Sequence, residues 1–329
     1  MVEFSVVHGD IMTRRCDLLI VKHADGFHGI DGLVADRIGF REHLSKGSYA
    51  LAGTGEIAAR KVLFCGVGPL DEFRYGQIRE FAAKSLSHAI RVVSAPRVIC
   101  SPLHGPGYGL DEKEAFFSLI GGFLDTVERC DAPPIVTKIE IVEINEARAE
   151  RLSKLLDELL NRSRLWSASP DRDDHGPLPS EDEIHRELAS FGAESERKPK
   201  LFVAMPFADE FSDIWEVAIQ DASASAGVVS ERLAEQAYVG DIVSQIKKRI
   251  SAASGLLAVL DGSSPNVFLE LGYAWALGKP TVLIARNGNK LPFDVQGQKC
   301  IAYTNIGGLR RQLSEELSSL KQEGAFLSA

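Results

Sequence analysis

Short apolar runs alternate with amphipathic stretches along the first half of the chain. The runs cover residues 4–9, 17–21, 61–68, 97–102 and 138–144, and each has the length of a β-strand. Helical periodicity marks residues 75–93, and four leucines recur at helical spacing before residue 160: Leu152, Leu155, Leu156 and Leu159. This alternation predicts a three-layer α/β/α domain over residues 1–160.

The second half has the same alternation in a more regular form. Apolar runs at residues 200–205, 227–232, 255–261, 281–286 and 299–303 are separated by helical stretches at 209–225, 240–253, 266–278 and 307–320. Short, almost wholly apolar strands are typical of parallel sheets covered on both faces. We therefore predict a flavodoxin-like, doubly wound, five-stranded parallel domain over residues 200–329.

The segment 161–199 interrupts this pattern. It is crowded with Asp, Glu and Ser and contains Pro170, Pro177, Pro179 and Pro199. Such a segment buries too little apolar surface to offset the chain entropy lost on ordering. It predicts an interdomain linker, with a short helix near residues 181–190; a surface excursion of a single domain is the alternative.

Composition excludes several classes of protein. The chain has 329 residues, 45% of them hydrophobic, and a net charge of −9, which argues against disorder and against long nucleic acids as partners. Its five cysteines lack metal-ligand spacing, so we expect reduced thiols and no metal. Without an apolar stretch long enough to span a bilayer or a signal-like start, we expect a cytoplasmic protein with no membrane partner.

Four segments of the first half, in this order, resemble macro domains, a family that binds ADP-ribose: VVHGDIMTRRCDLLIVKHAD, GFHGIDGLVADRIG, GTGEIAARKVLFCGVGP and SPLHGPGYGLDEKEA. The resemblance implies a macro-like fold in which Asp10, next to Ile11, accepts a hydrogen bond from the adenine amino group. It also implies phosphate-binding backbone at Gly29 and in the loop formed by Gly105, Gly107, Tyr108 and Gly109. Glycine lets backbone amides approach an anion closely.

One departure from catalytic macro domains bears on activity. De-ADP-ribosylating members carry an Asn-rich segment where this chain has Lys22, His23, Ala24 and Asp25. We therefore expect binding without hydrolysis. The same half also resembles the amino-terminal domain of leucine aminopeptidases, but no metal-ligand cluster accompanies it, so an aminopeptidase is excluded.

A glutamate within an apolar helix is the strongest chemical signal in the second half. The stretch LLAVLDGSSPNVFLELGYAWALGKP predicts a buried strand ending in Asp261 and a helix that starts near Pro265. Helical spacing places Asn266, Glu270 and Tyr273 near one face. The ordinary alternative for Glu270 is an exposed or salt-bridged surface residue; its apolar neighbours favour a functional one.

Residues 200–305 resemble nucleoside 2-deoxyribosyltransferase-like proteins and bacterial TIR-like domains. The resemblance implies that Glu270 is the catalytic residue, attacking or stabilising the anomeric carbon of a ribosyl group as the base departs. It implies that Asp261 and Asn266 hold sugar hydroxyls, or that Asp261 helps to protonate a leaving base.

Loops at the same predicted sheet edge supply further candidates for substrate binding. Met205, Pro206 and Phe207 follow the first strand of the second half, where the aromatic ring can stack on a base. Arg232 and Glu235 follow its second strand. Arg232 can bind a phosphate in a bidentate manner, and a structural salt bridge to Glu231 or Asp241 is the alternative.

These features together predict an enzyme that cleaves the N-glycosidic bond of NAD or a related nucleotide. We expect NAD as its substrate, no required cofactor, and regulation by an ADP-ribose-type nucleotide in the first domain, in bacterial antiphage or stress signalling. We also expect a homo-oligomer. The alternatives are a non-catalytic nucleotide-sensing protein and a nucleoside 2-deoxyribosyltransferase acting in salvage.

Overall fold

The computed structural model describes residues 2–25, 29–128, 136–162, 198–206, 208–233 and 242–326. Its contacts divide the chain into two compact units. The first comprises Met1–Gly105 with Glu112–Glu194, and the second comprises Pro106–Asp111 with Ser195–Ala329. Most of the predicted linker, residues 163–197, lies outside the described residues.

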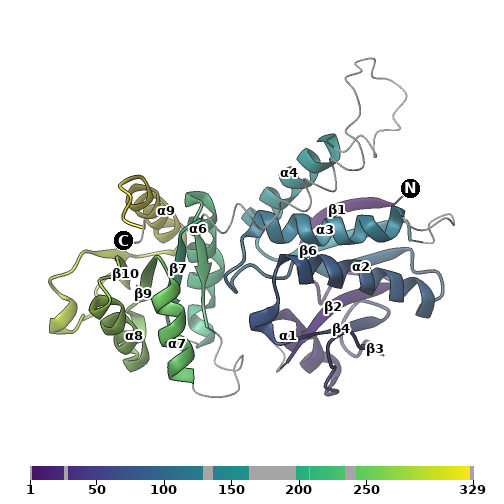
Figure 1. Ribbon diagram of the computed structural model, residues 1–329, viewed down its shortest axis with the longest axis horizontal. Coiled ribbons are helices and arrows are strands. Elements are labelled where there is room, and N and C mark those ends of the chain that lie inside the picture. The colour runs from purple at the N-terminus through teal and green to yellow at the C-terminus, as the bar shows by residue number, and fades with distance from the viewer. Residues whose placement is uncertain are drawn as a thin grey trace, which may run out of the picture. The chain divides into compact units, whose positions relative to one another are not determined.

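A six-stranded mixed sheet forms the centre of the first unit (Figure 1). Its order is β1-β6-β5-β2-β4-β3, and its neighbours are parallel except for the antiparallel pair β3–β4. The strands are β1 Glu3–His8, β2 Leu18–Ala24, β3 Tyr49–Ala52, β4 Val62–Gly68, β5 Val98–Pro102 and β6 Lys138–Glu143. The five predicted apolar runs are all strands. β3 was not predicted, because its four residues lie at the sheet edge and none is fully buried.

Helices cover this sheet and complete the first unit: α1 Ile30–Ile38, α2 Tyr75–Val92, α3 Glu112–Glu128 and α4 Glu146–Arg162. Val34 of α1 shares a buried cluster with Leu19 and Phe64 of the sheet. α2 and α3 lie side by side (Figure 1), and their approach requires Gly122, where an added Cβ would lie 2.2 Å from the Arg79 carbonyl oxygen.

The second unit contains an all-parallel five-stranded sheet in the order β11-β10-β9-β7-β8. The strands are β7 Lys200–Ala204, β8 Val229–Glu231, β9 Gly255–Val259, β10 Thr281–Arg286 and β11 Cys300–Tyr303. In chain order this is 2-1-3-4-5, the flavodoxin-like order. The predicted parallel, doubly wound sheet is confirmed.

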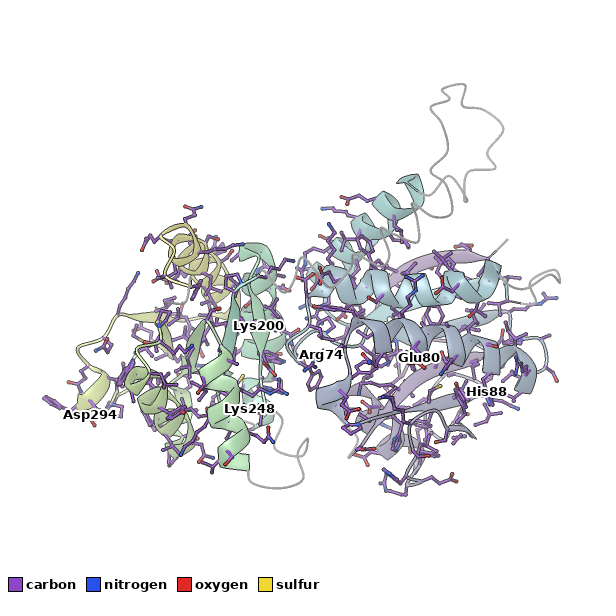
Figure 2. The ribbon with its side chains drawn as sticks, viewed as in Figure 1. Arg74, Glu80, His88, Lys200, Lys248 and Asp294 are labelled. Carbon is purple, nitrogen blue, oxygen red and sulfur yellow. The ribbon has the colours of Figure 1, made fainter. Side chains whose placement is uncertain are left out.

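Both faces of this sheet are apolar and covered by helices. Leu201 and Val203 belong to a buried cluster with Leu309, whereas the alternate residues Phe202 and Ala204 pack in a second cluster with Val267. The first cluster involves α6 Gln220–Ala226 and α9 Ile306–Gln322, and the second involves α7 Ile242–Ala252 and α8 Pro265–Ala276. Charged side chains such as Lys248 of α7 are exposed (Figure 2).

The predicted helix at 209–225 consists of three successive pieces. A 3₁₀ turn η4 (Asp209–Phe211) is followed by the π-helical segment η5 (Ile214–Ile219) and then by α6. Hydrophobic spacing does not distinguish a π turn from an α turn over so short a stretch. Across the described residues, no helix combines the length and apolar character needed to cross a membrane.

Candidate active site

The carboxyl ends of β7 and β9 form the candidate ligand-binding edge of the second unit. These strands are neighbours although β8 lies between them in sequence, so the winding of the chain reverses here. Open α/β sheets bind ligands outside the strand ends at such a reversal. Met205, which is buried, and Pro206, which is half-buried, follow β7, and Asp261 follows β9. The predicted contact Phe207 lies outside the described residues.

Asp261 is buried and accepts hydrogen bonds from three donors. The backbone N–H of Arg286 lies 2.7 Å from Oδ1, and the side-chain amide of Asn289 lies 3.3 Å from the same oxygen. The hydroxyl of Tyr303 donates to Oδ2. Burial and this hydrogen bond raise the pKa of Tyr303 well above its ordinary value, so the phenol remains a donor. Asp261 thereby joins the ends of β9, β10 and β11.

Glu270 lies in the second turn of α8, the helix that begins just beyond the end of β9. The helix starts at Pro265, after Ser264 in the N-cap position. The Glu270 carboxylate is half-buried and has no hydrogen-bond or ion-pair partner among the residues that the structure describes. Burial raises its pKa from 4.5 to about 7. An acid whose pKa is raised by burial, on the helix that follows a central strand, is a candidate catalytic group.

Asn266 and Tyr273 flank Glu270 on α8. Asn266 is exposed in the first turn, four residues before the glutamate. Tyr273 is half-buried; its hydroxyl lies 3.3 Å from Ser251 Oγ, and Lys247 Nζ lies 5.8 Å from its ring centroid. The Tyr273 side chain therefore contacts α7, while Asn266 faces solvent.

Arg232 follows β8, as the sequence predicts. Its guanidinium carbon lies 5.2 Å from the Trp215 ring centroid, and its Nη1 lies 3.7 Å from Met205 Sδ. Burial lowers the pKa of the guanidinium. Glu231, one of its two predicted alternative partners, forms an ion pair with Arg249. The other alternative partner, Asp241, and the predicted contact Glu235 lie outside the described residues.

The predicted adenine contact in the first unit lies at the end of β1. Asp10 is exposed there, and its Oδ1 accepts the N–H of Met12 at 2.9 Å. Ile11 beside it is buried. Gly29 precedes α1 with φ 71°, and Gly105 follows β5 with φ 112°. These positive φ values are strained for other residues, so each glycine is required by the backbone.

The other three residues of the predicted phosphate loop are Gly107, Tyr108 and Gly109. By their contacts they belong to the second unit, whereas Gly105 belongs to the first. Gly107 and Gly109 have φ values of 90° and 80°. That the seven predicted nucleotide-binding residues act as one site stays a prediction.

Lys22, at the end of β2, forms a buried ion pair. Lys22 and Asp31 are 2% and 0% exposed, and Lys22 Nζ lies 2.9 Å from Asp31 Oδ1. The Lys22 N–H also faces His104 Nε2 at 3.4 Å. Burial, reinforced by the Lys22 charge, holds the pKa of His104 well below its ordinary value. Sequence reasoning noted Lys22 but missed both partners.

Among the described residues, no group of three or more His, Cys, Asp or Glu side chains is arranged to hold a metal ion. The described cysteines, Cys16, Cys65, Cys100 and Cys300, are unbridged.

Comparisons with known proteins give structural similarity alone. No protein-family model matches the chain, and no curated protein matches it. A Trypanosoma brucei macrodomain in complex with ADP is 18% identical with a TM-score of 0.40 over 46% of this chain and 68% of its own. The same macrodomain in complex with ADP-ribose is 19% identical with a TM-score of 0.39 over 46% and 68%. An Oceanobacillus iheyensis macrodomain with ADP is 18% identical with a TM-score of 0.38 over 48% and 91%.

The two sheets and their helices define a two-domain α/β protein. One domain has a mixed sheet with an antiparallel edge strand, and the other has a doubly wound parallel sheet.

Proposed function

We propose that the second unit cleaves the N-glycosidic bond of NAD or a related nucleotide, with Glu270 as the catalytic carboxylate. The observation that carries this proposal is the half-buried Glu270 side chain on the helix following β9, with its pKa raised to about 7 by burial. A carboxyl group that is partly removed from water, with no cationic partner among the described residues, is costly for folding in its charged form, which favours a functional reason for its position.

The chemistry suits a lone carboxylate. As the bond between the ribose and nicotinamide breaks, its electron pair moves to the positively charged pyridinium nitrogen, and neutral nicotinamide leaves without needing a proton. The sugar acquires oxocarbenium character, which the Glu270 carboxylate stabilises or captures as a covalent ester. Attack by water then gives ADP-ribose, and attack by a second base gives a transfer product.

Other residues would bind the substrate. Arg232 would pair with a phosphate, and Asn266 would hydrogen-bond a ribose hydroxyl from the first turn of α8. Asp261 already accepts three hydrogen bonds. We therefore assign it the role of fixing the turn from β9 into α8, which positions Glu270, in preference to direct contact with the sugar.

The first unit would bind an ADP-ribose-type nucleotide that regulates this activity. Asp10 is exposed at a strand end, and its Oδ2 has no hydrogen-bond partner among the described residues. Backbone amides near Gly29 and Gly105 can hold phosphates without a basic surface. The buried Lys22–Asp31 pair in place of an Asn-rich segment favours binding over hydrolysis. A homo-oligomeric bacterial antiphage or stress-response protein is consistent with such regulation.

Incubating the purified chain with NAD, its 2′-phosphate and a set of deoxynucleosides, followed by mass spectrometry, tests the reaction. Nicotinamide and ADP-ribose as products, with a rate that responds to added ADP-ribose, would support the proposal. Exchange of bases on deoxyribose would instead support a salvage transferase. Binding of ADP-ribose without any turnover would support a non-catalytic sensor.

A further inference from the structure

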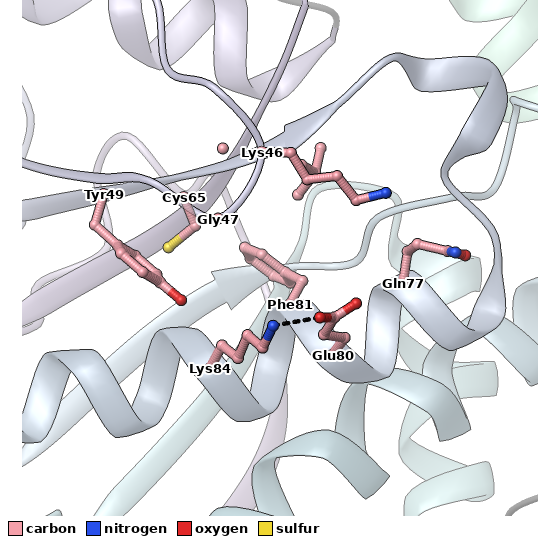
Figure 3. A pocket seen from close by; sticks show the side chains of 10 residues that line it. Lys46, Gly47, Tyr49, Cys65, Gln77, Glu80, Phe81 and Lys84 are labelled. Atoms are coloured by element: carbon pink, nitrogen blue, oxygen red, sulfur yellow. Dashed lines mark hydrogen bonds and ion pairs between the residues drawn. The ribbon is translucent and has the colours of Figure 1, made fainter.

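A cavity of ≈270 Å³ opens in the first unit beside the end of β4 (Figure 3). Figure 3 shows Lys46 and Tyr49 on the side of the segment leading into β3, and Glu80, Phe81 and Lys84 on α2. None of the residues predicted to bind a nucleotide lines this cavity. It is therefore separate from the functions proposed above.

The backbone around the cavity is fixed by close contacts. The N–H of Gly47 donates to the Gly66 carbonyl at 2.8 Å, and the N–H of Gly66 donates to Ser48 at 2.9 Å. A Cβ at Gly66 would lie 2.1 Å from the Ser45 carbonyl oxygen, so only glycine permits this approach. The wall formed by residues 45–48 is thus held firmly against β4.

The floor of the cavity is apolar. Cys65 and Phe81, which are 3% and 5% exposed, both line the cavity (Figure 3). Burial raises the pKa of the Cys65 thiol well above its ordinary value, so the group stays neutral. A neutral buried thiol behaves as a small apolar side chain. This floor suits the hydrocarbon part of a ligand.

One wall carries an oriented phenol. The Tyr49 ring stacks on His88 with centroids 4.1 Å apart and an interplanar angle of 7°. Burial raises the pKa of Tyr49, which keeps its hydroxyl protonated and able to donate.

Cations outnumber carboxylates among the described residues that line the cavity. These are Lys46, Lys84 and Glu80, and Glu80 pairs with Lys84 one helical turn later. Lys46 contacts Glu72 at 3.7 Å, with both side chains more than half exposed. Such an exposed ion pair is weak and is easily exchanged for a ligand anion.

We propose that this cavity binds a small aromatic carboxylate. The ring would lie on Phe81 and Cys65, and the carboxylate would accept hydrogen bonds from Tyr49 and from the ammonium groups of Lys46 and Lys84. The volume lies just below the range of about 300–1,000 Å³ for sites of drug-sized ligands. A single-ring anion therefore fits better than a nucleotide.

Fluorine NMR titration of the full chain with 4-fluorobenzoate tests the proposal, with 4-fluorobenzamide as a neutral isostere. A ligand of about ten non-hydrogen atoms is expected to bind with a Kd on the order of 1 mM. The amide should bind at least about fivefold more weakly, because it cannot use the excess positive charge. Equal binding of the two probes, or no binding of the acid, would overturn the proposal.

Substitutions around the cavity test where 4-fluorobenzoate binds, because some should lower its affinity and one should raise it. Lys84→Met and Tyr49→Phe should each weaken 4-fluorobenzoate binding about two- to fivefold, whereas Glu80→Gln should tighten it by a similar factor because a competing carboxylate is lost. Lys61→Met, an exposed lysine outside the cavity, serves as the control and should match the parent. Identical affinities for all four variants would show that the acid binds elsewhere and would overturn the proposal.

Discussion

The hydroxyl of Tyr303, at the end of β11, donates a hydrogen bond to the buried carboxylate of Asp261, which follows β9. The intervening strand β10 supplies a second donor through the backbone N–H of Arg286. Three strand ends are therefore held together immediately before α8, the helix that carries Glu270. The proposed role of Asp261, to support the candidate active site, rests on these hydrogen bonds.

Removing the Tyr303 hydroxyl should destabilise the second unit. Tyr303→Phe deletes one donor to a buried carboxylate that retains two others, so we expect the free energy of unfolding to fall by about 1–2 kcal/mol. Urea denaturation followed by tryptophan fluorescence reports on this unit through Trp215 and Trp275. Glu315→Gln, at an exposed position of α9 in the same unit, is the control and should change stability by less than about 0.5 kcal/mol. Equal effects of the two substitutions would contradict the role of Asp261.

The buried pair Lys22–Asp31 should be essential to the first unit. Asp31→Asn leaves the ammonium of Lys22 buried without its anion and should cost about 3–5 kcal/mol, measured by chemical denaturation. Replacing both residues with apolar ones, Lys22→Met with Asp31→Leu, should restore much of that loss. Glu56→Gln removes an exposed ion pair with Arg37 and should cost less than about 1 kcal/mol. A small effect of Asp31→Asn would show that the pair is not important for stability.

Adenine recognition by the first unit should depend on Asp10. Asp10→Ala removes a charged acceptor and should weaken ADP-ribose binding about tenfold or more in isothermal titration calorimetry. Asp36→Ala, an exposed residue of α1 that pairs with Arg41, is the matched control and should bind like the parent. Unchanged binding by the Asp10 variant would place the ligand elsewhere.

The half-buried Glu270 should make the free energy of unfolding fall as the pH rises. Its pKa is about 7 in the folded chain against an ordinary value of 4.5, so between these values the folded state holds a proton that the unfolded state has released. The free energy of unfolding therefore decreases across this window, by about 1–3 kcal/mol after allowing for partial exposure. Glu270→Gln should remove this dependence, so that the variant is more stable than the parent at pH 8 and not at pH 4.

Activity should also depend on the ionisation of Glu270, but it should rise with pH where stability falls. If the carboxylate is the reactive form, kcat/KM for nicotinamide release rises with pH and levels off above a midpoint near 7. A rate that falls through this midpoint would show that the protonated acid is required.

Much of the fold could be predicted from local pattern. Strands buried on both faces, such as 62–68 and 255–259, appear as apolar runs, and Pro265 marks the start of α8. β3 was not predicted because an edge strand of four residues needs little apolar surface. The π-helical form of residues 214–219 depends on packing that hydrophobic spacing does not encode.

The candidate site could be predicted only in part. Glu270 was identifiable because it is the one charged residue in an apolar helix. Tyr303 was missed because its contact with Asp261 depends on the order and register of β9, β10 and β11, which bring together residues 42 positions apart. Asp31 was missed for the same kind of reason, since its partner Lys22 lies on a different element.

Replacing Glu270 with glutamine tests the catalytic role most directly. The parent chain should release nicotinamide from NAD, and Glu270→Gln should reduce that rate at least about a thousandfold while its circular dichroism and ADP-ribose binding stay unchanged. Glu315→Gln, an exposed residue of α9, should retain the parent rate. Nicotinamide release by the Glu270 variant at the parent rate, or none by the parent, would contradict an enzyme built on this carboxylate.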